Sequence, residues 1–229
     1  MAAGINEGVA SPSTRYNNTD SIRIEDIVIQ NAVLGHTGSI TLQTAMNYSL
    51  NTGMVTIGKL LGGGSLNSTA RDKIYDYFHN RFGLGQETGI EVLESKGLLV
   101  SPKKAEGNAV RYSNMTFGQG MTTTMLQTAN AFSSLVNGGT LYKPSLIEGI
   151  VDENGKLSKK EPEINKEAVI SKETSEQMKQ VLEGVRKVGG AKDPAGYQIG
   201  GKTGTSQTIV DGRYVDYQTI GSYVGFGGG

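Results

Sequence analysis

The stretch Gly196-Tyr-Gln-Ile-Gly-Gly-Lys202-Thr-Gly-Thr-Ser-Gln207 fits two motifs that belong to incompatible local structures. From Gly196 to Thr203 it matches G-x-x-x-x-G-K-[ST], a loop that holds phosphate groups and opens a helix. From Lys202 onward it reads Lys-Thr-Gly-Thr, a motif that lies on a β-strand. Both motifs place a lysine beside a hydroxyl and a glycine, so the neighbouring residues must decide between them.

The residues on both sides favour the strand. A phosphate loop must run into a helix, because the free N–H groups of the first helical turn help to hold the anion. Residues 205–210 are instead rich in β-branched side chains, and Asp211-Gly212 is a hairpin signal. The preceding residues 187–195 are polar and glycine-rich, unlike a buried strand. We therefore predict a hairpin of strands at 197–209 and 214–226, with a nucleotide hydrolase as the disfavoured alternative.

The composition narrows the classes of protein to consider. The 229 residues fit one large domain or two small ones, and 22 basic against 22 acidic residues leave no net charge to attract nucleic acid. There are no cysteines, which excludes disulfides and thiolate metal sites, and only two histidines, His36 and His79, which we interpret as structural or solvated. We predict no metal site and no cofactor.

Hydrophobic periodicity predicts helices first and strands last. Helical patterns cover residues 41–61, 68–82, 124–136 and 171–185, and Thr52-Gly53 favours a break within the first of them. Residues 1–40 have the composition of loops and short strands, and Asn154-Gly155 predicts a hairpin. Because strands and helices do not alternate regularly, the predicted fold class is α+β.

Three short motifs carry the functional prediction: Ser49-Leu-Asn51 at a helix break, Phe117-Gly-Gln-Gly120 ahead of a helix, and Lys202-Thr-Gly-Thr on the late strand. Their order, together with flanks such as Leu42-Gln-Thr-Ala45, resembles the transpeptidase domain of penicillin-binding proteins, most of all the monofunctional, class B branch. The resemblance runs over residues 6–226. It implies a serine β-lactamase/transpeptidase-like fold in a single domain, with a helical subdomain and part of an antiparallel sheet.

The resemblance also implies an activity and a set of partners. Such domains are D,D-transpeptidases that crosslink peptidoglycan stem peptides ending in D-Ala-D-Ala through an acyl-serine intermediate, and they bind β-lactam antibiotics. Cell-wall synthesis or division proteins are further expected partners. The expected location is the extracytoplasmic face of a bacterial plasma membrane. No apolar run in the sequence reaches the roughly 18 residues that span a bilayer, so we expect any anchor to lie outside these residues.

The family's site maps onto seven positions of this chain, of which four are implied to be catalytic (Ser49, Asn51, Lys202 and Thr205) and four to bind substrate (Thr203, Gly204, Thr205 and Gln207). By this resemblance Ser49 and Lys202 relay a proton, and Asn51 donates a hydrogen bond to the substrate backbone. The two threonine hydroxyls hold the terminal carboxylate, and the backbone N–H of Thr205 supplies half of an oxyanion hole.

Each of these residues has an ordinary alternative. Ser49 could cap the second helix, and Asn51 could be a turn residue. Lys202 could be a solvated edge lysine that discourages aggregation, and the threonines could be ordinary strand residues. Gly118 and Gly120 are expected to be structural in either case.

The acylated serine of such enzymes lies in a Ser-x-x-Lys motif at a helix start. The match in this chain, Ser101-Pro-Lys-Lys104, follows Ser49, whereas the family order puts the nucleophile first. We interpret it as a surface turn. We therefore expect the sequence to begin downstream of its nucleophile, to end before the last strand and helix, and to be inactive by itself. A D,D-carboxypeptidase or β-lactamase of the same fold and a non-catalytic scaffold that binds peptidoglycan or division proteins remain as alternatives.

Overall fold

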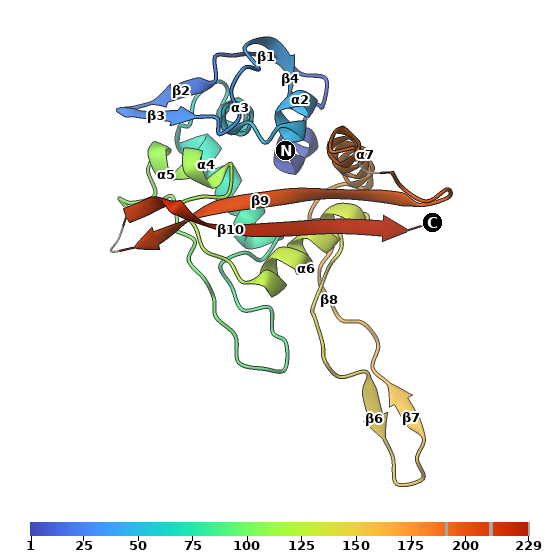
Figure 1. The fold of residues 1–229 in the computed structure, drawn as a ribbon. Coiled ribbons are helices and arrows are strands. Elements are labelled where there is room, and N and C mark those ends of the chain that lie inside the picture. Colours follow the sequence, from blue (N-terminus) through green and yellow to red (C-terminus); the bar gives the residue numbers. More distant parts are fainter. Residues whose placement is uncertain (191, 211–212, 229) are drawn as a thin grey trace.

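A computed structural model describes residues 1–190, 192–210 and 213–228. It consists of a helical body, a long β-hairpin that runs along one side of it, and an arm that projects away (Figure 1). The helices are α1 (Ala2–Asn6), α2 (Leu42–Asn47), α3 (Asn51–Leu61), α4 (Ser68–Tyr75), the π-helical η1 (Asp76–Arg81), α5 (Ala109–Met115), α6 (Met125–Val136) and α7 (Lys172–Val188). The α+β class predicted from the sequence is confirmed.

The strands pair in antiparallel twos within the described residues. The pairs are β1 (Arg15–Asn18) with β4 (Gly38–Thr41), β2 (Ser21–Ile24) with β3 (Ile27–Gln30), β5 (Leu141–Tyr142) with β8 (Ile164–Lys166), β6 (Gly149–Val151) with β7 (Leu157–Lys159), and β9 (Gln198–Val210) with β10 (Arg213–Gly228). No helix in the described ranges has the length and apolar character needed to cross a membrane.

Side-chain caps fix where most of the longer helices begin. Thr41, Asn67, Asn108, Thr124 and Ser171 each accept a hydrogen bond from the backbone N–H three residues further on. Such a cap satisfies one of the N–H groups that a helix start leaves open, and its loss costs about 1 kcal/mol. Ser171, the first residue of the helix predicted at 171–185, is one of these caps.

Two large apolar clusters hold the helical body together. One joins α1, η1, α6 and α7 around Tyr77, and the other joins α3, α4 and α5 to the β2–β3 hairpin around Tyr112. Both tyrosines are buried, yet each hydroxyl has a partner: Tyr77 donates to Glu7 at 2.9 Å and Tyr112 to the carbonyl of Val100 at 2.8 Å. Burial raises the pKa of Tyr77 to about 12.

The break between α2 and α3 occupies residues 48–50, so Ser49 lies at a helix break as predicted. Thr52-Gly53, which was expected to favour the break, is instead inside α3, and that part of the prediction was wrong. Packing overrides the low helix propensity of glycine here. A Cβ on Gly53 would collide with the Cβ of Ala45, which means that α2 can approach α3 this closely only because residue 53 has no side chain.

The β9–β10 hairpin confirms that Lys202-Thr-Gly-Thr lies on a strand and not in a phosphate loop. β9 runs without interruption through Lys202-Thr-Gly-Thr, so the helix that a phosphate loop needs after Thr203 is replaced by a strand. The glycine pair that created the phosphate-loop match has a packing role. A Cβ on Gly200 would lie 2.5 Å from Phe226, and one on Gly201 would collide with Tyr223. The turn predicted at Asp211-Gly212 lies outside the described residues.

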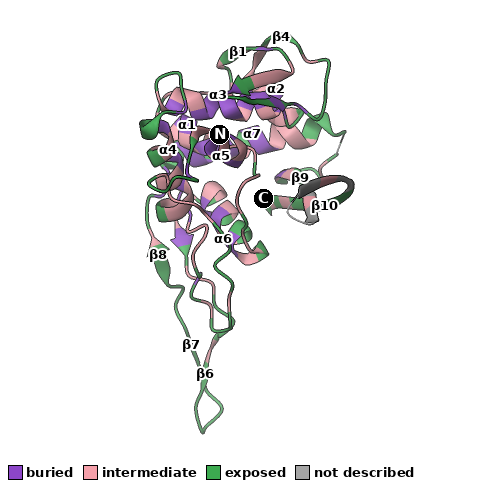
Figure 2. Ribbon diagram, turned by 90° about the vertical axis from the view of Figure 1, so that its left-hand side faces the viewer, coloured by how far each residue is buried: buried purple, intermediate pink, exposed green. Residues whose placement is uncertain are grey.

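Some local predictions were incomplete. α1 falls in the stretch expected to hold only loops and short strands, and α5 was not predicted. The helix predicted at 68–82 is present, but its last part is π-helical before Gly83 ends it in the left-handed conformation (φ +70°). The Asn154-Gly155 hairpin is confirmed as β6–β7, at the tip of the projecting arm, which is exposed along most of its length (Figure 2).

Candidate functional site

Ser49 and Lys202 meet although 153 positions separate them in the chain. The Nζ atom of Lys202 donates a hydrogen bond to the Oγ atom of Ser49, and also to the carbonyl of Thr203 at 3.0 Å. The serine comes from the α2–α3 break and the lysine from β9. The pair therefore lies where the helical body faces the long hairpin (Figure 1). The sequence predicted these two residues as partners, and the structure brings them together.

The backbone presents Ser49 in an unusual conformation. Its φ of +55° lies in the left-handed region, which non-glycine residues occupy at a cost of about 1–2 kcal/mol. The short link between the helices imposes it: Ser49 N–H bonds to Met46 O at 3.3 Å and Leu50 N–H to Ala45 O at 2.8 Å. The N-cap of α3 is Leu50, whose side chain makes no cap. The ordinary interpretation of Ser49 as a helix cap is therefore wrong.

Lys202 is partly buried, and burial lowers the pKa of its ammonium group below the ordinary value of 10.5. Within the described ranges it forms no ion pair with a carboxylate that would offset this effect. A lysine whose charged form is disfavoured gives up its proton more readily. Hydrogen-bonded to a serine hydroxyl, it is suited to passing protons, and it is not the solvated edge residue of the alternative interpretation.

Asn51 begins α3 but makes no hydrogen bond to Ser49 or Lys202 in the described part of the chain. Its Nδ2 donates to the carbonyl of Gln30 at 2.8 Å. Asn31, the residue after Gln30, makes a second contact with the start of α3, because its Oδ1 accepts the backbone N–H of Thr52 at 3.0 Å. We call these two contacts the clamp on α3. The end of β3 thus takes over the capping that Leu50 cannot supply.

A buried polar network stands behind this clamp, and sequence reasoning did not find it. Asn18 is 1% exposed, and its Oδ1 accepts the hydroxyl of Thr52 at 2.8 Å and the amide of Asn31 at 3.3 Å. Its Nδ2 donates to Asp20 at 3.0 Å and to the carbonyl of His36 at 2.8 Å. In the sequence these residues resemble ordinary turn formers. No local signal showed that they would converge on the start of α3.

The remaining predicted residues follow one another along β9. Thr203, Gly204 and Thr205 are exposed, and a Cβ on Gly204 would lie 2.6 Å from the Oγ of Ser222 on β10. The backbone of Gln207 is part of β9, but its side chain lies outside the described residues. Within the described ranges β9 pairs only with β10, so its second edge carries no strand.

An aromatic pair flanks the serine. The rings of Tyr48 and His36 stack with centroids 4.0 Å apart, and Tyr48 is directly bonded to Ser49 in the chain. The other histidine, His79, stacks on Tyr75 and its Nδ1 lies 3.1 Å from the carbonyl of Leu84. Both histidines make structural contacts, as their sequence context indicated.

The remaining two motifs have structural positions. Phe117-Gly-Gln-Gly120 forms the turn that leaves α5, and Arg111 Nη1 holds the carbonyl of Gly120 at 2.9 Å. Ser101 and Lys104 are joined only by a turn hydrogen bond, Lys104 N–H to Ser101 O at 3.1 Å, and no helix begins there. The prediction that this motif is a surface turn is confirmed.

Solved structures place this arrangement in the class of serine β-lactamase/transpeptidase-like folds. Penicillin binding protein 3 from Mycobacterium tuberculosis, solved with aztreonam, superimposes with a TM-score of 0.82 at 27% identity, over 98% of this chain and 50% of that one. Penicillin binding protein 2X from Streptococcus thermophilus gives a TM-score of 0.81 at 22% identity, over 98% and 34%. The second likeness, at this identity, shows the fold alone.

Sequence comparison then identifies the family. Residues 1–227 match the penicillin binding protein transpeptidase domain, and the chain belongs to that family. It is 37% identical over 196 residues to stage V sporulation protein D of Bacillus subtilis, covering 84% of this chain and 28% of the relative. Penicillin-binding protein PbpB of Mycolicibacterium smegmatis is 30% identical, over 91% and 32%. These relatives are class B proteins, and the chain spans about a third of their length.

Proposed function

We propose that this chain carries the residues that relay protons and hold the substrate in a peptidoglycan D,D-transpeptidase, and that it binds β-lactams at the same site. One observation carries the proposal: Lys202 donates a hydrogen bond to Ser49 across 153 positions, beside a strand edge that is open within the described residues. Four of the relatives are named for the same activity, as probable peptidoglycan D,D-transpeptidases PenA of Neisseria species.

The proton relay follows from the chemistry of acyl transfer. A serine that attacks the D-Ala-D-Ala carbonyl must lose a proton, and the departing amine must gain one. The hydroxyl of Ser49 can accept one proton while it donates another. Because its pKa is lowered, Lys202 can give a proton to this relay or take one from it. The attacking serine itself is assigned to no described residue, because Ser101 lies in a turn outside this site.

The substrate would lie along β9. An extended peptide can add to an open strand edge through main-chain hydrogen bonds, and the exposed hydroxyls of Thr203 and Thr205 are available for its terminal carboxylate. Gly204 keeps the strand surface free of side chain. The backbone N–H of Thr205 is the proposed oxyanion donor, a contribution of about 10²–10³ in rate. Asn51 and Gln207 complete the proposed substrate contacts.

Covalent labelling tests the proposal. The extended chain, defined as residues 1–229 preceded by a Ser-x-x-Lys helix of the family type, is expected to react with a fluorescent penicillin, and the chain alone is not. Replacing Lys202 with alanine should abolish labelling of the extended chain. Labelling of the chain alone at Ser101, identified by peptide mass mapping, would overturn both the assignment of the site and our interpretation of that motif.

The products separate the activities that share this fold. Supplied with a D-Ala-D-Ala stem peptide and an amine acceptor, a transpeptidase yields the crosslinked dimer, whereas a carboxypeptidase yields free peptide and D-alanine. We expect the dimer, because the relatives named for an activity are transpeptidases. The proposed location is the outer face of the plasma membrane, where the peptidoglycan substrate lies.

A further inference from the structure

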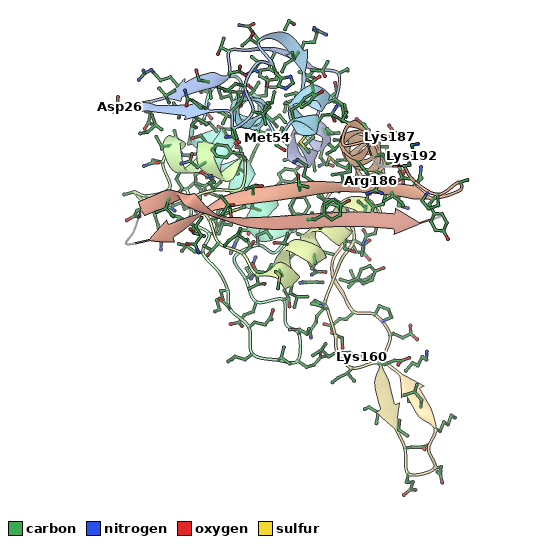
Figure 3. All side chains as sticks on the ribbon, in the orientation of Figure 1. Asp26, Met54, Lys160, Arg186, Lys187 and Lys192 are labelled. Carbon is green, nitrogen blue, oxygen red and sulfur yellow. The ribbon has the colours of Figure 1, made fainter. Side chains whose placement is uncertain are left out.

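A hollow in the surface lies at the opposite end of α3 from Ser49. It has a volume of about 390 Å³ and is bounded by the β2–β3 hairpin, the last turn of α3, the loop that follows it, α4 and the start of α5. Lys59, the α3 residue that lines the pocket, follows the first residue of α3 by eight positions, so about 12 Å of helix separates the pocket from the start of α3 beside Ser49. Asp26 marks the tip of the hairpin that forms its outer wall (Figure 3).

The charges in this pocket are strongly unbalanced. Arg23, Lys59 and Arg71 line it, against a single carboxylate, Glu25. Within the described ranges none of the three cations belongs to an ion pair. The chain as a whole has no net charge, so this is a local concentration of positive charge. Like charges gathered in one concavity repel one another and attract an anion.

The donors in the pocket are only partly used. Arg71 Nη1 donates to the carbonyl of Leu66 at 2.8 Å, which holds the guanidinium in place, while its Nε is buried and has no partner in the described residues. An unsatisfied buried donor costs about 1–3 kcal/mol, and structures rarely leave one without a reason. The hydroxyl of Ser65 makes no hydrogen bond within the described part of the chain, although it lies at the same pocket.

The loop that carries Ser65 and leads into α4, the helix that bears Arg71, is fixed in advance. Asn67 is engaged at both ends of its amide: Oδ1 accepts the N–H of Ala70 at 3.0 Å, and Nδ2 donates to the carbonyl of Gly62 at 2.8 Å. A Cβ on Gly62 would lie 2.6 Å from Asn67 Oδ1, so the turn is tightly closed. A ligand that binds here would therefore meet the loop of Ser65 and the guanidinium of Arg71 already ordered, which lowers the entropic cost of binding.

We propose that this pocket binds a phosphate group, between the guanidinium groups of Arg23 and Arg71 and the ammonium group of Lys59. Three cations and one carboxylate leave two positive charges, which match the charge of about −1.5 to −2 on a phosphate monoester near neutral pH. A ligand that carried a single carboxylate group would neutralise only one of these two positive charges. The planar guanidinium also fits phosphate oxygens in a two-pronged manner, and the hydroxyl of Ser65 supplies a further donor.

Pyrophosphate is the probe for a direct test, titrated calorimetrically into the full chain at low ionic strength. Binding is expected for the wild type, with at least a fivefold weaker affinity for Lys59→Gln and for Arg71→Gln. Lys104→Gln is the matched control, because Lys104 is exposed, unpaired among the described residues, and lies outside the pocket. Its affinity should stay within twofold of the wild type. No binding, or an equal loss in the Lys104 variant, would overturn the proposal.

Arg71→Gln also removes the hydrogen bond to Leu66, so its thermal unfolding is measured alongside. If that variant fails to fold, Lys59→Gln and Arg23→Gln decide the matter, since neither side chain supports another described residue through a hydrogen bond.

Vesicles distinguish a lipid headgroup from a soluble phosphate. Phosphatidylglycerol vesicles that bind the chain, are displaced by pyrophosphate and lose binding in Lys59→Gln would identify the headgroup as the source. Pyrophosphate binding without vesicle binding would identify a soluble phosphate. Phosphatidylcholine vesicles serve as the neutral control. Vesicle binding that neither pyrophosphate nor the Lys59 variant reduces would exclude the lipid headgroup as the ligand of this pocket.

Discussion

Two serine–lysine pairs in this chain differ in whether their side chains meet in the folded structure. Ser101 and Lys104 satisfy a local catalytic pattern, three residues apart, but form a turn in which no hydrogen bond joins their side chains. Ser49 and Lys202 lie 153 positions apart and form a direct hydrogen bond between a helix break and a strand. Spacing in sequence therefore brings side chains together only if the backbone between them folds as the pattern assumes.

The two pairs also differ in surroundings. Lys202 is partly buried with a lowered pKa, and Ser49 is held in a strained conformation by the backbone hydrogen bonds of the short link between α2 and α3. Lys104 is exposed. Burial, strain and second-layer hydrogen bonds are features of functional sites, because they tune proton affinity and fix geometry. Each prediction below tests whether these differences have consequences.

The largest effect is expected from the lysines. In the extended chain, Lys202→Ala should slow penicillin acylation by at least 10²-fold, since positioned proton transfer contributes about 10²–10⁴. Lys104→Ala should change it by less than twofold. Stopped-time labelling gives both rates. Equal effects of the two substitutions would remove the distinction between the pairs.

The clamp behind the site should contribute to stability. Asn31→Ala leaves the backbone N–H of Thr52 buried without its acceptor, and we expect a loss of about 1–3 kcal/mol in the free energy of unfolding. Asn80→Ala is the control, because Asn80 makes its side-chain hydrogen bond to Asp76 in an exposed position and should cost under about 0.5 kcal/mol. Urea denaturation measures both. A negligible loss for Asn31→Ala would mean that the network does not hold α3.

Strain at Ser49 predicts opposite changes in stability and activity. Ser49→Gly should stabilise the fold by up to about 1 kcal/mol, because glycine occupies φ +55° freely. Acylation of the extended chain should nevertheless fall with the loss of the hydroxyl. Ser49→Ala, which loses the hydroxyl but keeps the strain, separates the two effects when both variants are compared by urea denaturation and labelling. A glycine variant no more stable than the alanine one would show that the strain is negligible.

The smallest effect concerns pH. Because burial lowers the pKa of Lys202, the unfolded chain holds this proton more tightly than the folded chain. Between the lowered pKa and the ordinary 10.5, the contribution of Lys202 to stability should therefore rise with pH; at lower pH the full penalty of burying the charge remains. The difference in unfolding free energy between wild type and Lys202→Met should reflect this rise from pH 7 to 10. A flat difference would argue for a well-solvated lysine.

Local patterns predicted much of this fold. The α6 and α7 helices are capped by Thr124 and Ser171, the first residues of the helices predicted at 124–136 and 171–185, because capping and periodicity are properties of adjacent residues. The β6–β7 hairpin forms at Asn154-Gly155 for the same reason. The predictions failed where contacts distant in sequence override propensity. Gly53 stays helical because it packs against Ala45, and α5 is short and was missed.

The features of the site also fall into those that sequence patterns predicted and those that only the folded structure revealed. Ser49, Asn51 and Lys202 could be selected from ordered motifs and their resemblance to a family, and the choice of a strand over a phosphate loop followed from β-branched residues and a hairpin signal. The sequence could not reveal that Asn18 and Asn31 clamp α3, nor that Ser49 is strained, nor that Arg23, Lys59 and Arg71 share a pocket. Secondary structure and motif identity depend on near neighbours along the chain. Burial, proton affinity and the meeting of side chains 153 positions apart depend on which surfaces pack together, and only the tertiary structure decides that.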